Sequence, residues 1–179
     1  MMERQTQIIE LASRIVQDTG KVNDYLTSKN LPQPSFGIDG PINLTLESHE
    51  ADEARTSAIG ASLELTDLLQ GPISCLRPAI NATSLEAIYR WNIPSKVPLD
   101  GSEISFGALA EKCKMYEPNL RRILRYAILY HRVFREPRAG FVAHSAASAL
   151  LVKDPATFDA LGMMFDESWQ AFARVGSPV

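Results

Sequence analysis

The stretch that decides the fold is residues 117–144, EPNLRRILRYAILYHRVFREPRAGFVAH. It opens with Glu117-Pro118, and proline is well tolerated at the first helical position because the N–H it lacks has no helical partner there. After this helix, Val133-Phe134 and Phe141-Val142 are short strand candidates, joined by a turn over Pro137 to Gly140. One buried helix face is predicted by apolar residues at helical spacing, which are Leu120, Ile123, Leu124, Ala127 and Ile128.

Amphipathic helices are predicted on both sides of this stretch. Apolar residues at helical spacing predict long helices over 3–29 and 48–70, with a connector rich in proline and glycine between them at 31–46. Gly71-Pro72 ends the second helix, since glycine commonly follows a last helical turn and proline cannot continue it. Further helices are predicted over residues 73–80, 82–92, 106–115, 146–152 and 155–173. Ser105 and Ser145 are expected to cap two of these helices.

A mainly α fold follows from this order of elements. From residue 82 onward, the predicted order is helix, short strand within 97–104, helix, helix, strand, turn and strand. That order is typical of a winged helix-turn-helix with a small β-hairpin. The two long helices that precede it are not required by that arrangement. Their apolar stripes predict a separate helical segment suited to dimerisation.

Length and composition bound the possible functions. The chain has 179 residues, 45% of them hydrophobic and 22% charged, which is typical of a soluble globular domain. Its net charge of -3 gives no global signal for nucleic acid or an anionic membrane. We find no membrane-length apolar run and no secretory signal, so we expect a cytoplasmic protein without a membrane partner. Cys75 and Cys113 are isolated, which favours free thiols in a reducing compartment.

A local basic cluster stands out against the acidic balance. Between residues 112 and 138, eight Lys and Arg side chains face only two Glu. In a DNA-binding winged helix, the helical arginines of this cluster would enter the major groove and a hairpin arginine would lie in the wing. The alternative is a solvated helix face that pairs with acids of a partner chain or domain. The acidic chain favours this alternative, so we expect no nucleic acid partner. The candidate interaction surface comprises Arg121, Arg122, Arg125 and Arg138.

No catalytic motif accompanies this surface. His49, His131 and His144 are scattered, and none lies in a metal-binding or nucleophile motif. A histidine at a helix end, such as His131, is expected to be structural. The sequence has neither GxGxxG nor GxxxxGK[ST], so it offers no Rossmann site for a dinucleotide or S-adenosylmethionine. We therefore expect no catalytic, cofactor-binding or metal-binding residues in this chain.

Several strings resemble the fungal secondary-metabolite O-methyltransferases. They include ELTDLLQGP at 64–72, VPLDG at 97–101, LRRILR at 120–125, FREP at 134–137 and VAHS at 142–145. The resemblance covers most of the chain. It implies the N-terminal part of such an enzyme, which combines dimerisation helices with a winged-helix-like module. In that family, S-adenosylmethionine and the catalytic histidine belong to a following Rossmann-like domain.

The resemblance also implies that three segments of the chain have different roles. We expect N-terminal dimerisation helices over 1–80, a winged-helix-like module over 81–153, and a C-terminal helix over 154–179 leading toward a catalytic domain that the chain lacks. Such a region would be a dimerisation and substrate-lid domain that is not catalytic alone. Its expected partners are a second copy, a catalytic methyltransferase domain in cis or in trans, and an aromatic small molecule. Apolar surface on 3–29 and 155–173 supports the dimer, because soluble monomers rarely expose such patches.

An alternative function remains open from the sequence. Some members of the family resemble methyltransferases but act as pathway regulators that partner a transcription factor. The alternative is a stand-alone, methyltransferase-like regulatory or DNA-binding winged-helix protein of a biosynthetic pathway. The strings quoted above are shared by both groups, so they do not separate these two functions.

Overall fold

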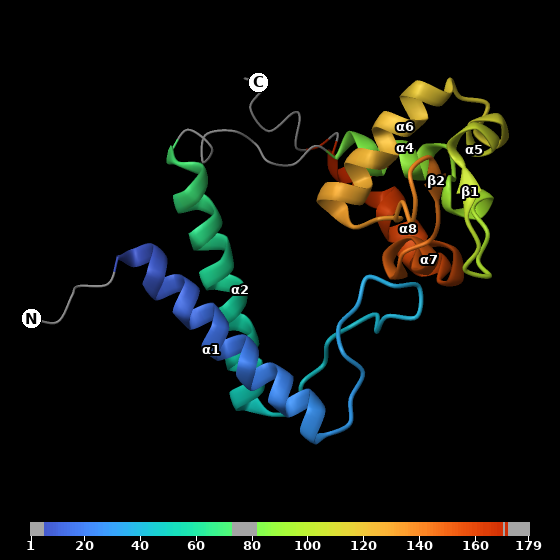
Figure 1. Cartoon of the computed structure of the whole chain (residues 1–179). Coiled ribbons are helices and arrows are strands. Elements are labelled where there is room, and N and C mark those ends of the chain that lie inside the picture. Colours follow the sequence, from blue (N-terminus) through green and yellow to red (C-terminus); the bar gives the residue numbers. More distant parts are fainter. Residues whose placement is uncertain (1–5, 73–81, 170, 172–179) are drawn as a thin grey trace, which may run out of the picture. The chain divides into compact units, whose positions relative to one another are not determined.

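The fold is mainly helical with one small antiparallel sheet, as the sequence predicts (Figure 1). The computed structural model describes residues 6–72, 82–169 and 171. Two compact units account for the chain, one formed by Met1–Pro34 with Asn43–Ile80 and the other by Ser35–Ile42 with Asn81–Val179. The helix predicted over 73–80 lies outside the described residues.

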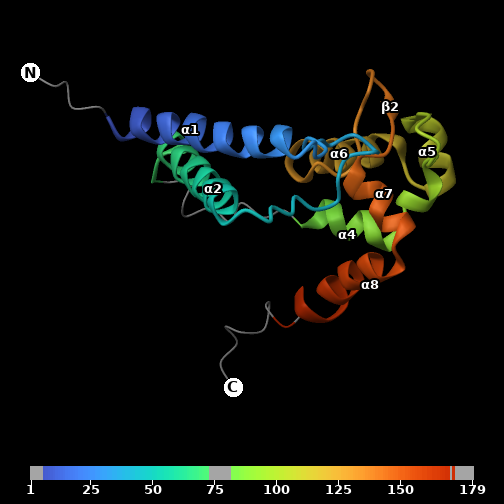
Figure 2. The same ribbon diagram turned by 90° about the horizontal axis from the view of Figure 1, so that it is seen from below.

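The first unit is a pair of helices, α1 (Gln7–Ser28) and α2 (His49–Gln70), which lie against each other (Figures 1 and 2). They run antiparallel, because Gln7 near the start of α1 donates a hydrogen bond to Glu64 near the end of α2. Alanines on one face of α2 let the α1 backbone approach closely. The buried apolar residues of this interface are Leu11, Leu26, Ala51, Ala54, Ala58 and Ala61.

One charged side chain lies within this otherwise apolar contact. Asp18 of α1 is 7% exposed and accepts a 2.5 Å hydrogen bond from the hydroxyl of Ser57 on α2. Lys21 Nζ lies 3.7 Å from the same carboxylate. Because a buried carboxylate must keep such partners, this group favours one register of α1 on α2.

The second unit is built from short helices around one core. In chain order these are α4 (Thr83–Arg90), the 3-10 turn η1 (Pro94–Lys96), α5 (Phe106–Cys113), α6 (Glu117–Tyr126), α7 (Ala146–Lys153) and α8 (Pro155–Met163). Two π-helical turns, η2 (Ala127–His131) and η3 (Met164–Ser168), extend α6 and α8. The largest buried side chains of the core cluster are Ile88, Ile93, Phe106, Leu109, Leu120, Leu124 and Phe134.

The sheet corrects one prediction. Strands β1 (Ile104–Ser105) and β2 (Phe141–Val142) pair antiparallel, with Ile104 opposite Val142. The strand predicted at Val133-Phe134 is wrong, and the hairpin is reduced to a single bridge between Arg135 and Ala143. Phe134 has a φ of 67°, which a strand residue cannot adopt. Its N–H donates instead to the Ser145 hydroxyl at 3.0 Å.

Both predicted serine caps are confirmed. Ser105 accepts a hydrogen bond from the N–H of Ala108 at the start of α5. Ser145 begins α7 and forms a reciprocal capping box with Ser148. Each cap satisfies an N–H that has no partner inside its helix.

Residues 35–42 pack with the second unit although they lie between α1 and α2 in sequence. The carbonyl of Phe36 accepts a hydrogen bond from the N–H of Ala146, at the start of α7. The guanidinium of Arg132 lies over the Phe36 ring, 5.6 Å from its centroid. The segment turns tightly between Ser35 and Gly40. A Cβ added at Gly40 would lie 2.2 Å from the Ser35 carbonyl oxygen. Only glycine fits there without rearranging the backbone.

Candidate interaction surface

Helix α6 carries three of the four candidate arginines and is anchored by its opposite face. Leu120 and Leu124 are both 0% exposed and belong to the core of the second unit. Arg121 and Arg125, one turn apart, lie over the ring of Phe106 with their Cζ atoms 5.5 and 5.6 Å from its centroid. Such stacking of a guanidinium on an aromatic ring stabilises by about 0.5–1 kcal/mol at an exposed site. These two arginines therefore cover the core edge at α5.

Arg125 is also tied to the loop before β2. Its Nε and Nη2 donate to Glu136 at 2.9 and 2.7 Å, and Glu136 accepts a third hydrogen bond from the N–H of Gly140. The Arg125 guanidinium holds the pKa of Glu136 below its usual range, and Glu136 in turn raises the pKa of Arg125. A bidentate pair of this kind fixes orientation as well as charge. It clamps the turn region onto α6.

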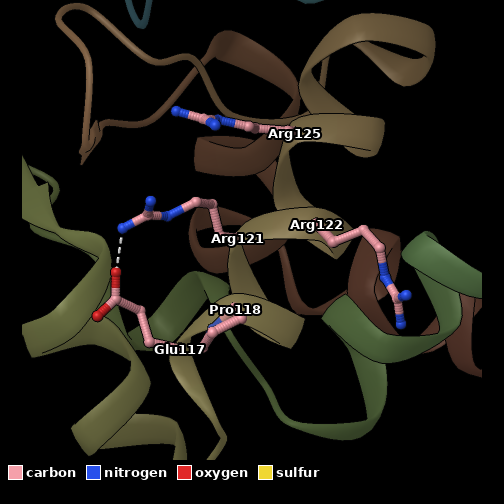
Figure 3. A pocket seen from close by; sticks show the side chains of 5 residues that line it. All are labelled: Glu117, Pro118, Arg121, Arg122 and Arg125. Carbon is pink, nitrogen blue, oxygen red and sulfur yellow. Dashed lines mark hydrogen bonds and ion pairs between the residues drawn. The ribbon is translucent and has the colours of Figure 1, made fainter.

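The other two paired arginines also use acids of the same unit. Arg121 forms an ion pair with Glu117, one turn earlier on α6 (Figure 3). Arg138, in the turn before β2, pairs with Glu103 beside β1 and lies 3.3 Å from the centroid of Phe141. Three of the four candidate arginines are thus charge-balanced within the second unit.

Arg122 differs from its neighbours on α6. Figure 3 shows its side chain extending to the opposite side of the helix from Arg121 and Arg125. Arg122 is exposed, and among the described residues it has neither an ion pair nor a hydrogen bond from its guanidinium. An open cavity of about 320 Å³ is lined by Glu117, Pro118, Arg121, Arg122 and Arg125.

The structure therefore does not bring the four arginines to one point. Sequence reasoning found the cluster and counted Glu117 and Glu136 within it, but it did not predict their ion pairs with Arg121 and Arg125. The Glu117–Arg121 pair could have been found, because a pair four residues apart on a helix is a local signal. No local signal links Arg138 to Glu103, which lies 35 residues away in the sequence. The use of these arginines as an interaction surface stays a prediction.

His144 and Cys113 are buried in the second unit. His144 is 0% exposed, with Nδ1 2.9 Å from the Ser148 hydroxyl and Nε2 3.2 Å from the Val97 carbonyl oxygen. Burial lowers the pKa of His144 and raises the pKa of the Cys113 thiol, so both groups are held in their neutral forms. Across residues 6–72, 82–169 and 171, no three His, Cys, Asp or Glu side chains gather at metal-binding distance.

A second candidate surface lies on the first unit. An apolar groove of about 470 Å³ runs between α1, α2 and the connector. Val16 lies one turn before Thr19 of this groove and is 73% exposed, while Leu63 lies one turn after Ile59 and is 63% exposed. The groove is lined by Thr19, Val22, Asn23, Leu26, Gln33, Pro34, Leu44, Arg55, Ala58 and Ile59. The sequence predicted apolar stripes here but not this groove.

Comparison with known proteins identifies relatives of the chain. The chain is 54% identical to the grayanic acid biosynthesis cluster O-methyltransferase of Cladonia grayi over 169 residues, which is 94% of this chain and 37% of that protein. It is 47% identical to O-methyltransferase pyvH of Aspergillus violaceofuscus over 94% of this chain and 39% of the relative.

A chlorophenol O-methyltransferase of Trichoderma longibrachiatum is more distant, with 32% identity over 96% of this chain and 37% of that protein. The homologues of the chain are therefore fungal O-methyltransferases of secondary metabolism, as the sequence strings predicted. The chain spans less than half the length of these relatives, a share consistent with the N-terminal region of such a protein. No family model matches the chain. None of the described helices combines the length and apolar character needed to cross a bilayer.

Proposed function

We propose that this chain is the dimerisation and substrate-lid module of a fungal secondary-metabolite O-methyltransferase and does not transfer a methyl group alone. Homology to O-methyltransferases supports the parent activity. S-adenosylmethionine does not fit the described residues, whose sheet has only two short antiparallel strands. A Rossmann-type site needs a parallel strand leading through a glycine-rich turn into a helix. The cofactor would belong to the part of the relatives that this chain does not cover.

The observation that carries dimerisation is the apolar side of the α1–α2 pair. Val16, Ile59 and Leu63 are each at least half exposed, beside an apolar groove large enough to receive side chains of a partner. Burying one such side chain stabilises an association by about 1.5–3 kcal/mol. A second copy of the same surface would cover these residues symmetrically, since most soluble oligomers are homodimers.

The substrate-lid role is supported by the second unit. Met163 on α8 is 61% exposed and Trp169, just after η3, is 43% exposed. Trp169 adjoins a ring cluster in which Phe165 lies 6.4 Å from both Trp169 and Tyr89. Aromatic and methionine side chains of this kind suit an apolar aromatic ligand. The name of the Trichoderma relative specifies a chlorophenol, so we propose an aromatic hydroxyl compound as the substrate class.

Sedimentation velocity tests the dimer directly. We expect wild type to sediment as a dimer at micromolar concentration and Val16→Glu to shift the chain to a monomer, because a charge would be buried in the apolar contact. Gln17→Glu is the matched control, since it adds the same charge at the adjacent exposed position, which lies about 100° further round α1. A wild-type monomer at these concentrations would overturn the proposed dimer.

The stand-alone regulatory or DNA-binding alternative is tested separately. Glu117, Glu136 and Glu103 already neutralise three of the four candidate arginines and would repel phosphates. We therefore expect no binding of duplex DNA even at low salt, where phosphate contacts are strongest. Tight low-salt binding that weakens steeply with added salt would instead establish the alternative.

A further inference from the structure

One side of α6 and η2 carries a row of four side chains, of which Arg122, Leu129 and Tyr130 are exposed and Tyr126 is half-buried. We define the Arg122 ridge as Arg122, Tyr126, Leu129 and Tyr130. These residues are spaced four, seven and eight positions apart, so they follow one face of the helix. Leu129 is 57% exposed and Tyr130 is 63% exposed, and the rings of Tyr126 and Tyr130 stack with centroids 4.4 Å apart. Part of the ridge lies on η2, a π-helical turn, and such turns are frequent at functional sites.

The ridge combines apolar surface with an uncompensated cation. On the other side of α6, Arg121 and Arg125 each have a glutamate of the same unit. Arg122 has no such partner among the described residues, and Figure 3 shows it directed away from both. Arginine and tyrosine are the residue types most enriched where proteins bind each other tightly. The ridge thus places the positive charge of Arg122 beside the rings of Tyr126 and Tyr130, and a partner protein can neutralise the charge and cover the rings.

We infer that the Arg122 ridge is the docking site for a protein surface that presents a carboxylate to Arg122 and apolar side chains to Tyr126, Leu129 and Tyr130. This inference rests on the proposed function and names the partner surface as the methyltransferase portion of the relatives. That portion accounts for most of their length, because the chain spans only 37% of the Cladonia grayi protein. An arginine fork pairs with a carboxylate in two parallel hydrogen bonds, which fixes orientation as well as charge.

A protein partner fits the ridge better than nucleic acid does. Binding to phosphates needs several uncompensated cations along one path, because each neutralised phosphate contributes separately. Here the neighbouring Arg121, Arg125 and Arg138 are balanced by glutamates that would face the phosphates. Leu129 adds apolar surface that a phosphate backbone does not match. The chemistry that remains is one carboxylate beside apolar side chains.

The test uses the Cladonia grayi O-methyltransferase with its matching segment replaced by this chain. Hydrogen–deuterium exchange of residues 118–131 is compared between this chimera and the chain alone. Docking should slow exchange there at least tenfold, because a covered helix opens less often. Arg122→Ala in the chimera should abolish this protection. Arg138→Ala, which removes an arginine that already has a partner, should leave the protection unchanged.

Three results would overturn the inference. The first is equal exchange of residues 118–131 in the chimera and in the chain alone. The second is equal protection of these residues in the Arg122→Ala chimera and the wild-type chimera, and the third is low-salt DNA binding by the chain alone that Arg122→Ala abolishes. The last result would assign the ridge to nucleic acid. If the chimera does not fold, the separate remainder of the Cladonia grayi protein is titrated into the chain, and unchanged exchange at 118–131 again overturns the inference. Dimerisation is measured by sedimentation with Val16→Glu, so its failure and the failure of ridge docking remain distinct.

Discussion

His144 shows how a buried polar side chain is held by its neighbours. The Val97 carbonyl can only accept a hydrogen bond, so Nε2 carries the proton and Nδ1 accepts from the Ser148 hydroxyl. Its ring also packs on Phe134, with centroids 5.5 Å apart. The imidazole thereby connects three places in the fold: Val97 at the end of η1, Ser148 of α7, and Phe134. A neutral ring satisfies every one of these contacts.

The pH dependence of stability follows from that neutrality. Burial lowers the pKa of His144, with the nearby Lys153 adding to the effect, so the unfolded chain binds a proton more readily than the folded chain. The free energy of unfolding should therefore fall as pH drops below about 6.5, the usual histidine pKa. Urea unfolding at about pH 7.5 and about pH 5.5 measures this change.

The matched variants isolate the contribution of that one ring. His144→Gln should unfold more readily at both pH values and lose most of the pH dependence. His49→Gln should leave the free energy of unfolding almost unchanged, because the His49 side chain is exposed and its ion pair is with Glu53 on the same helix. A pH dependence that survives in His144→Gln would contradict the assignment.

At the scale of elements, the two serine caps of the second unit should differ in energy. Ser105 accepts only the N–H of Ala108, whereas Ser145 accepts the N–H groups of both Ser148 and Phe134. Replacing a cap by alanine costs about 1 kcal/mol. Ser145→Ala also leaves the buried Phe134 N–H without a partner, which adds about 1–3 kcal/mol. In urea unfolding, the free energy of unfolding of Ser145→Ala should therefore be well below that of Ser105→Ala. Equal losses of this free energy in the two variants would show that the hydrogen bond from the Phe134 N–H to Ser145 contributes nothing.

Helices were predictable from the sequence because their signals are local. Apolar spacing placed α1 and α2, and Ser105, Pro118 and Ser145 marked three helix starts. The strand at Val133-Phe134 failed because its backbone follows a tertiary hydrogen bond to Ser145 rather than its own β propensity.

The candidate surface was only partly predictable for the same reason. Counting arginines located the cluster, but a count cannot show which of them meet an acid in the folded chain. The pairing of β1 with β2 brings Arg138 next to Glu103. Arg125 forms its ion pair with Glu136 of the loop that precedes β2. That Arg122 is exposed and has no acidic partner among the described residues can be recognised only after these partners are placed.

At the scale of the whole molecule, the two units differ in how much apolar area they bury. The core of the second unit includes Phe106, Phe134 and Phe165, each at most 2% exposed. Four of the six apolar residues buried between α1 and α2 are alanines, which bury little area each. The helical pair should therefore have low stability alone and depend on the proposed second copy.

Hydrogen–deuterium exchange over a dilution series tests this dependence. If a second copy covers the α1–α2 groove, association stabilises the pair by mass action, by about 2.7 kcal/mol at a hundredfold excess over the dissociation constant. Amides of α1 and α2 should then exchange faster on dilution, while those of α5 and α6 should not change. Exchange in α1 and α2 that is independent of concentration would mean that the alanine-lined contact and the Asp18–Ser57 hydrogen bond stabilise the pair without a partner. In the Val16→Glu variant, exchange should match that of the diluted wild type at every concentration.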